Sequence, residues 1–430
     1  MNLKNTKFRP IYYGWWISIT ALIVNAILSA PTFGAAGLWI NSLENEFGWT
    51  RTQLAIAFSL GQLEGTVSAP FIGYFIDKIG GKKTALIGIF FVLIGFLILS
   101  QTVPLTDSRN NIFDPTIFYI AYLTIMLGGS MAGWVPMTSI VNNWFTHKRT
   151  LAMSIASSGF SIGTFLLVPL LAFLMNPNNL GWNKTAIGIA LLMPLVTISI
   201  WKFIYDKPIE KSLLPYGEYS KEHINNTTKY IQNSKDFTIL EAIKEKVFWI
   251  MAFAHGGSAM LTSTLMVHLI LAFKNQGLSL QTSSLMWGIT MGIGGLSQLL
   301  GGIIGDKFNK RYSLAFCGCI QSFAVIIAYM INSTQLAILF ALIYGIGFGV
   351  RVSITTAMRG EYFGRKSFGK IMGISIIPMM FMSMVAPVIA GYMYDLQNDY
   401  KIAFISIGSL GFIMSLMFIL AKPPIHPSEK

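Results

Sequence analysis

Charged side chains are scarce in this sequence. They make up 11% of its 430 residues, whereas 53% of the residues are hydrophobic. A soluble globular protein typically carries about 25% charged residues, so the composition excludes that class and indicates a protein that meets lipid. Cysteine is also rare. Cys317 and Cys319 lie in one apolar segment, and their spacing suits neither a disulfide nor a metal site.

Several common chemistries lack their sequence signatures. The sequence has no phosphate-binding loop of the form Gly-x-x-x-x-Gly-Lys-Ser/Thr, which argues against ATP hydrolysis. It has no His/Cys cluster with metal-ligand spacing and no convincing set of nucleophile, base and orienting acid. We therefore expect no cofactor, no metal site and no enzymatic activity. We also expect the first apolar segment to be retained, because it is too long for a cleaved signal peptide.

The basic residues are distributed unevenly. A formal net charge of +13 would suggest nucleic-acid binding in a soluble protein. In the helix assignment given below, however, 25 of the 31 Lys and Arg residues lie on the cytoplasmic side, five lie outside and one lies within the membrane. This asymmetry is the positive-inside pattern of a membrane protein, so no nucleic-acid partner is expected.

Twelve apolar segments are long enough to cross a bilayer, which takes about 20 residues. They cover residues 13–40, 52–76, 84–102, 116–145, 151–174, 186–205, 247–273, 283–304, 314–331, 335–358, 371–394 and 403–421. The polar stretch 206–246 divides them into two sets of six. We predict an all-α membrane protein with an N-terminal bundle (1–205), a cytoplasmic linker (206–246) and a C-terminal bundle (247–430), and with both termini in the cytoplasm.

A charged turn between two apolar segments occurs twice. The first copy has Gly73, Asp77 and Lys78, and the second copy, 229 residues later, has Gly302, Asp306 and Lys307. A second pair of stretches, which begin at Trp144-Phe145 and Tyr362-Phe363, is offset by 218 residues. Repeats at such distances imply two related halves. In each turn the Asp can cap or pair across a helix end, and the basic residues hold the loop in the cytoplasm.

The duplicated turn resembles the signature loop of the major facilitator superfamily. Other stretches resemble its monocarboxylate and oxalate/formate transporter branch: Tyr12-Tyr13-Gly14-Trp15-Trp16, Glu46-Phe47-Gly48-Trp49, Phe58-Ser59-Leu60-Gly61-Gln62 and Trp144-Phe145 with Lys148-Arg149. The resemblance covers both halves. It implies two pseudo-symmetric six-helix bundles that expose a central site alternately to either side of the membrane. Oxalate/formate-like members carry basic residues in helices 8 and 11, where this chain has Gln298 and Ser375, so dicarboxylate specificity is not expected.

Arg351 is the one Arg or Lys deep in an apolar segment. Charge in hydrocarbon is costly and marks transport pathways, and a guanidinium matches a carboxylate with two parallel hydrogen bonds. Tyr344 and Thr355 share its helix face. We therefore predict that Arg351 anchors an anionic substrate. One alternative is a role in gating or in pairing between the halves. The other is a side chain that extends to the cytoplasmic surface of the membrane, near Arg359.

Glu64 is the corresponding acidic residue. It lies 13 residues, or about 20 Å along a helix, from Asp77. A carboxyl that is removed from water favours its neutral form, and access to water would release the proton. We predict that Glu64 couples transport to protons. The alternatives are a hydrogen-bonded Glu that packs against the eleventh predicted helix (residues 371–394) and a permanent pair with a basic residue.

The resemblance also implies that helices 1, 4, 7 and 10 line the cavity. The predicted substrate-binding residues are Asn25, Trp134, Gln298, His255, Tyr344, Arg351 and Thr355. The predicted gating residues are Asp77, Lys78, Arg149, Asp306 and Lys307. For any single Ser or Thr the alternative is a hydrogen bond to its own helix. His268, nearer the outer end, is expected to serve a gate or an interface.

The sequence thus predicts a monomeric secondary transporter in the inner membrane. Its expected substrate is a small monocarboxylate-like anion, moved by proton symport or by anion exchange. Export of a drug or another amphipathic compound is the alternative within transport. Outside transport, two alternatives remain. One is a membrane sensor that passes its signal on through residues 206–246, and the other is a membrane enzyme.

Overall fold

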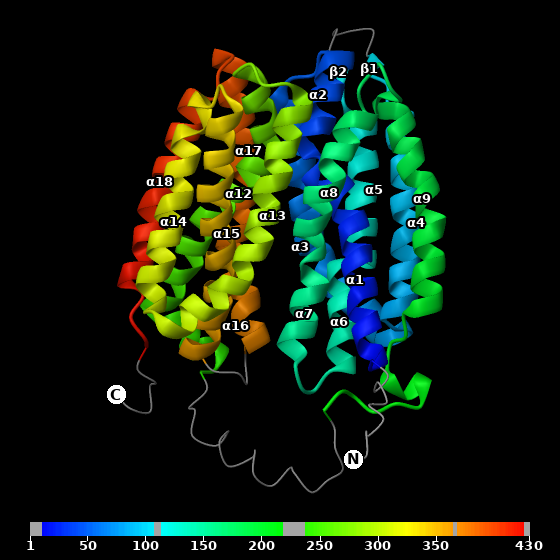
Figure 1. The fold of residues 1–430 in the computed structure, drawn as a ribbon, viewed down its shortest axis with the longest axis vertical. Helices are drawn as coiled ribbons and strands as arrows, with labels where there is room; N and C mark the ends of the chain where they lie inside the picture. Colours follow the sequence, from blue (N-terminus) through cyan, green and yellow to red (C-terminus); the bar gives the residue numbers. More distant parts are fainter. Residues whose placement is uncertain (1–10, 107–112, 218–236, 364–367, 425–430) are drawn as a thin grey trace, which may run out of the picture.

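A computed structural model of the chain describes residues 11–106, 113–217, 237–363 and 368–424 (Figure 1). The first group of elements comprises α1 (Tyr13–Ser29), the π-helix η1 (Ala30–Gly34), α2 (Ala36–Phe47), α3 (Arg51–Ile79), α4 (Gly81–Ser100), β1 (Leu105–Thr106), β2 (Phe113–Asp114), α5 (Thr116–Ala132), α6 (Trp134–Trp144), α7 (Arg149–Ser157), α8 (Gly159–Leu174) and α9 (Gly181–Phe203). We call this group the N half. Its two strands pair antiparallel.

The remaining elements form the C half, on the other side of the molecule in Figure 1. They comprise the short α11 (Ile239–Lys244), α12 (Lys246–Asn275), α13 (Leu280–Lys307), α14 (Lys310–Ile327), η4 (Ala328–Met330), α15 (Thr334–Phe363), α16 (Phe368–Ser375), α17 (Ile377–Gln397) and α18 (Lys401–Leu420). Between the halves, the 3₁₀ turn η2 spans Pro208–Lys211. Tyr216 then pairs with Phe145 through a parallel bridge, which attaches this part of the predicted linker to the N half.

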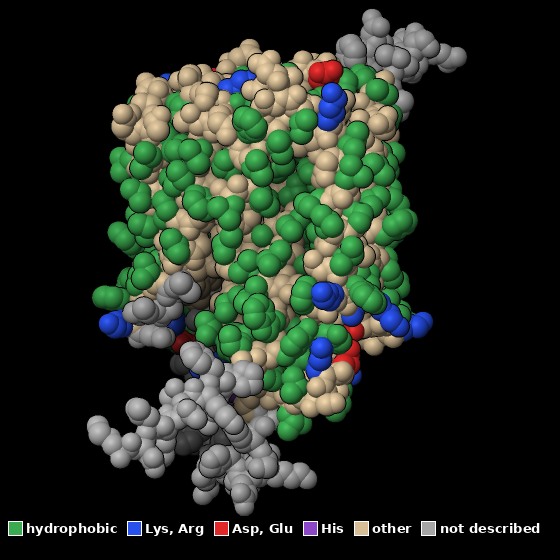
Figure 2. Space-filling view, turned by 45° about the vertical axis from the view of Figure 1, so that its right-hand side comes forward, with side chains coloured by type: hydrophobic (Ala, Val, Ile, Leu, Met, Phe, Trp, Pro, Cys, Tyr) green, Lys and Arg blue, Asp and Glu red, His purple; other side chains and the backbone are tan. Residues whose placement is uncertain are grey.

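The described part of the chain contains ten spans long and apolar enough to cross a membrane. The helices α3 and α13 are 29 and 28 residues long but are not among these ten. Figure 2 shows hydrophobic side chains over the middle of the face in view, with charged side chains near the two ends. This distribution matches a hydrocarbon core bounded by polar interfaces. The chain is a helical multi-pass membrane protein.

Four of the predicted segments contain a break that sequence patterns did not reveal. They are interrupted at η1, Gly133, Ser158 and Ile376. The π-helix η1 contains Pro31, which lacks a backbone N–H. Ala35 N donates a hydrogen bond to Ala30 O, five residues earlier, at 2.7 Å. This wider turn is a π-bulge, a feature that is frequent at functional sites.

The two halves contact each other toward one end. We call the end at which α1 begins and α18 ends the inner end, and the opposite one the outer end. Near the outer end, Lys274 Nζ donates to Asn41 Oδ1 at 2.6 Å, and Trp287 Nε1 donates to Gly34 O at 3.1 Å. Among the described residues, the hydrogen bonds between the halves reach inward only to Thr66, in the middle of α3. The ribbons diverge from there toward the inner end (Figure 1).

Candidate functional site

A central cavity of about 500 Å³ lies where the two halves meet. Its polar lining includes Asn25, Ser29, Ser130, Ser161 and Gln298, and Trp134 contributes an indole. Of the predicted substrate-binding residues, the cavity brings together Asn25, Trp134 and Gln298. None of its described lining residues is charged. The cavity therefore offers neutral hydrogen-bonding groups to a small ligand.

Helix breaks position this lining. Asn25 is 6% exposed, and its Nδ2 donates to Ala156 O in α7 at 3.0 Å, which fixes the amide between α1 and α7. The break at Gly133 separates α5 from α6 and leaves Trp134 at the start of α6 with an exposed fraction of 57%. Ser29, beside the π-helix, has a buried hydroxyl without a partner among the described residues. The site thus keeps a hydroxyl available next to the cavity.

Arg351 lies outside this lining, although its neighbour Val352 is part of it. The Arg351 side chain is directed toward α14, where its Nε donates to Gln321 Oε1 at 2.8 Å. Arg351 is 2% exposed, and its Nη1 has no partner in the part of the chain that the structure describes. The close approach depends on Gly347, where a Cβ would lie 2.9 Å from Cys317 O. Arg351 is therefore a buried cation held by a neutral amide.

The other predicted residues of the C half lie around this arginine. Arg359 Nη2 donates to His255 Nδ1 at 2.8 Å, and since an arginine only donates, the remaining imidazole proton is assigned to Nε2. The hydroxyls of Tyr344 and Thr262 are 3.0 Å apart. Thr355 Oγ1 donates to Arg351 O at 2.8 Å, which is the hydrogen bond to its own helix that was the alternative to ligand contact. The structure thus separates the predicted binding residues into the cavity set and this interior set.

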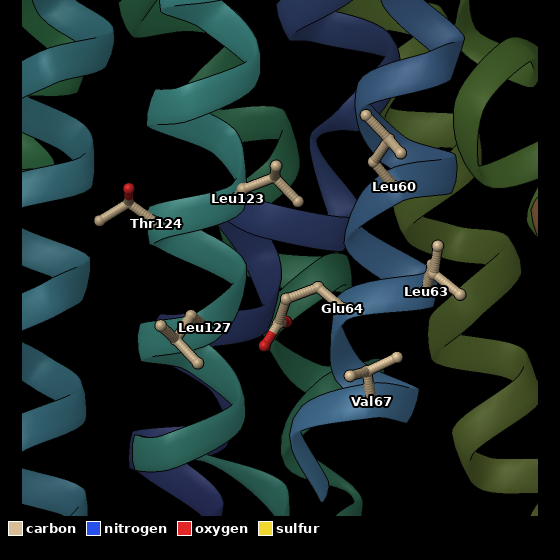
Figure 3. A pocket seen from close by; sticks show the side chains of 7 residues that line it. All are labelled: Leu60, Leu63, Glu64, Val67, Leu123, Thr124 and Leu127. Carbon is tan, nitrogen blue, oxygen red and sulfur yellow. The ribbon is translucent and has the colours of Figure 1, made fainter.

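Glu64 extends from α3 toward α5, beside an apolar groove between the two helices (Figure 3). The groove has a volume of about 440 Å³, and Leu60, Leu63 and Leu127 are among the residues that line it. Both carboxylate oxygens are buried without a hydrogen bond from any described residue, although the hydroxyls of Ser68 and Ser130 lie near them. The structure records no ion pair for Glu64 among the described residues. Its carboxyl lies against α5 rather than against the eleventh predicted helix (residues 371–394).

The next residue, Gly65, lines the central cavity and not the groove. Ser130 also lines the central cavity. The Glu64 carboxyl therefore lies in the wall between the groove and the cavity.

The predicted gating residues lie at the inner end. Asp77 and Lys78, at the end of α3, are exposed, as is Lys307 at the end of α13. Within the described residues, Asp77 makes no ion pair and no side-chain hydrogen bond. The side chains of Arg149 and Asp306 lie outside the described part. The gating role of these residues therefore stays a prediction.

Sequence comparisons identify the relatives of this chain. The family model described as Major Facilitator Superfamily matches residues 21–350 and 251–430. The oxalate:formate antiporter of Oxalobacter formigenes is 22% identical over 239 residues, which cover 55% of this chain and 50% of the antiporter. Monocarboxylate transporter 10 of Rattus norvegicus is 22% identical over 440 residues, which cover 97% of this chain and 80% of that transporter.

Structural comparison supports the same fold. The crystal structure of a D-xylose-proton symporter has a TM-score of 0.71 with this chain, at 15% sequence identity, and the match covers 97% of this chain and 100% of the symporter. At this identity the likeness is informative about the fold alone. Together with the sequence matches and the membrane-spanning helices, it confirms the predicted family. The chain belongs to the major facilitator superfamily, resembles oxalate/formate and monocarboxylate transporters at low sequence identity, and is a transporter rather than an enzyme.

Proposed function

We propose that this chain is a secondary active transporter of a small, monocarboxylate-like organic anion. In this proposal α3 and α13 join the ten apolar spans to give twelve membrane-spanning helices in two six-helix bundles. The inner end and both termini lie in the cytoplasm, where most Lys and Arg residues are expected. The bundles rock against each other and expose the central cavity to one side at a time. The protein works as a monomer in the inner membrane.

The observation that carries the proposal is the unbalanced charge of Arg351. This guanidinium is 2% exposed and has no ion pair with a described carboxylate. A buried charge is costly unless it is paired. Gln321 supplies one acceptor, but Arg351 Nη1 and Gln321 Nε2 both lack partners among the described residues. An anionic substrate would supply the missing negative charge and accept the unused hydrogen bonds.

The route to Arg351 begins in the central cavity. Its neutral lining admits an anion without holding it permanently, and Val352 places the backbone of α15 at the cavity wall. In the proposed cycle, the Arg351 side chain turns from Gln321 toward the anion as the halves close around it. Asn25 and Gln298 then complete the site from the cavity side.

The proposal includes proton coupling at Glu64. A buried carboxylate that has two nearby hydroxyls but no cationic partner among the described residues is unfavourable, so we infer that Glu64 carries a proton in the arrangement described here. Its place between the groove and the cavity gives the proton an exit when water reaches it. Proton symport then follows if the proton and the anion cross in the same half-cycle, and exchange follows if the proton stays in place.

Export of an amphipathic compound is the second candidate function. It is favoured by the apolar groove beside Glu64, which lies between two helices and includes the exposed side chains of Leu63 and Val67. Such a groove would admit an apolar ligand from the bilayer, with the Glu64 carboxylate as partner for a cationic group.

A thermal-shift screen on purified protein separates the two candidates. We expect small monocarboxylates to raise the melting temperature, because a ligand at 100 times its Kd stabilises the folded state by about 2.7 kcal/mol. If lipophilic cations stabilise the protein and carboxylates do not, the anion proposal is wrong and the second candidate replaces it.

Asp77 provides a test of the alternating cycle. We propose that Asp77 helps to hold the inner end closed in the outward-open state through contacts of its carboxylate at the helix end. We therefore expect Asp77→Asn to slow transport without reducing expression. Labelling of a cysteine introduced at the inner end should rise in the same variant. Glu210→Gln, which changes an exposed acid in η2, is the matched control. Normal turnover together with normal labelling in Asp77→Asn would remove the latch role.

A further inference from the structure

The first turn of α3, in the N half, is capped by a side chain of the C half. Asp395, near the end of α17, accepts hydrogen bonds from the backbone N–H groups of Arg51 at 3.0 Å and Thr52 at 2.9 Å. The Thr52 hydroxyl adds a third hydrogen bond, at 2.5 Å. A carboxylate at this position also meets the positive end of the helix dipole.

The rest of the cap comes from residues at the start of α3 itself. Thr50 Oγ1 accepts from Gln53 N at 3.2 Å, and Gln53 Oε1 accepts from Thr50 N at 2.9 Å, which makes a capping box. The box leaves the N–H groups of Arg51 and Thr52 unsatisfied, as the first helical N–H groups are in any helix. These two groups therefore depend on Asp395 whenever the outer end is closed.

Gly391, one turn before Asp395 on the same face of α17, allows this close contact. A Cβ at Gly391 would lie 3.0 Å from the carbonyl carbon and oxygen of Arg51 and from Thr52 N. That separation is tighter than ordinary van der Waals contact. Gly391 and Asp395 thus form a cradle for the start of α3.

The Arg51 side chain makes the reciprocal contact, from the N half into the C half. Its guanidinium carbon lies 3.7 Å from the centre of the Tyr394 ring, and Nη1 donates to Tyr400 Oη at 2.8 Å. Glu44 of the N half holds Nε at 3.0 Å. Arg51 is 4% exposed, so it is buried with its charge balanced by Glu44 and its face covered by an aromatic ring.

The pocket for Arg51 is held in place by further bonds of the C half. Burial raises the pKa of Tyr400, so its hydroxyl remains a donor. That hydroxyl lies 2.9 Å from Nδ1 of His268 in α12, and His268 Nε2 lies 2.8 Å from Pro387 O in α17. With Arg51 donating to Tyr400, the proton positions that satisfy every group run from Tyr400 to His268 and from His268 to Pro387. The start of α18 is thereby tied to α12 and α17.

We propose that Asp395, Gly391 and Arg51 form an outer latch that keeps the outer end closed, and that its release controls how often the cavity opens to the outer side. The latch acts on the position of the halves and not on the substrate, so it does not depend on which compound is transported. When the halves part at the outer end, two helix N–H groups and one guanidinium must exchange their partners for water. Removal of the cap should therefore favour the outward-open state.

Sided labelling of the cavity tests this proposal. Ser157→Cys, in a background with Cys317→Ser and Cys319→Ser, places one thiol in the cavity lining where the native hydroxyl is exposed, and a membrane-impermeant maleimide is applied from either side of oriented vesicles. Asp395→Ala should raise outer-side labelling about 2- to 30-fold, the range that corresponds to loss of a helix cap, and should lower inner-side labelling. Gly391→Ala should act in the same direction, because the added methyl group pushes α17 away from α3 while Asp395 remains.

The matched control is Asp399→Ala. Asp399 is partly buried in the turn between α17 and α18, and among the described residues its side chain accepts a hydrogen bond only from Lys401 N of its own half, so labelling should not change. A variant that is merely less well folded would label faster from both sides, whereas a lost latch moves the two rates in opposite directions. Unchanged labelling in Asp395→Ala and Gly391→Ala, or an equal rise from both sides, would overturn the proposal.

Discussion

Arg351→Gln is expected to abolish measurable binding and transport of the anion. The substitution removes the one cation that is proposed to meet the substrate, whereas Gln321 and the cavity lining remain. Arg351→Lys keeps the charge but loses the planar fork, so it should weaken binding by about 1.5–3 kcal/mol, or roughly 10- to 150-fold in affinity. Binding is measured by ligand-induced thermal shift and transport by uptake into proteoliposomes.

The stability of the unliganded variant distinguishes an anchor from a structural residue. Because Arg351 is buried without a counter-charge among the described residues, its replacement by Gln should leave the melting temperature unchanged or raise it. A structural arginine would instead lower it when removed. Arg311→Gln, at the inner end of α14, is the control and should bind the anion normally. Wild-type affinity in Arg351→Gln would place the anchor elsewhere.

Glu64→Gln is expected to abolish accumulation of the substrate and to leave exchange intact. Glutamine mimics the protonated carboxyl permanently, so the variant cannot release a proton to complete a symport cycle. Exchange of internal for external substrate never requires that release. In the wild-type protein, uptake should increase as the external pH falls, because the proton and the anion bind in the same half-cycle, and this dependence should disappear in the variant.

Both parts of the Glu64 result are needed. Glu46→Gln, which changes an exposed acid near the outer end, should accumulate substrate normally. If Glu64→Gln still concentrates substrate under a pH gradient, Glu64 has no part in coupling. If the variant loses exchange as well, Glu64 serves binding or folding, and coupling must be sought at His255 or in an ion other than H⁺.

The fold could be predicted from the sequence because its signals are local or repeated. Long apolar segments report burial in lipid one helix at a time, and the turns at Asp77 and Asp306 report the duplication. The helix breaks were missed because a single residue such as Gly133 or Ser158 does not interrupt an apolar segment. Whether such a residue ends a helix is decided by the neighbouring helices, which the local pattern does not record.

The candidate site could be predicted only in part. Rarity of charge identified Arg351 and Glu64, but not the side of the helix on which each meets its partners. The contact of Arg351 with Gln321 depends on the close approach of two helices at Gly347. The outer latch had no signal, because Arg51 and Asp395 are 344 residues apart in sequence and each resembles an ordinary polar residue at a helix end.

Counterflow in proteoliposomes tests the central claim most directly. Purified protein is reconstituted with a high internal concentration of an unlabelled monocarboxylate, and a trace of the labelled compound is added outside. The account predicts a transient accumulation of label that is lost in Arg351→Gln and kept in Glu64→Gln. Absence of counterflow for every small carboxylate tested, with counterflow of a lipophilic cation instead, would contradict it.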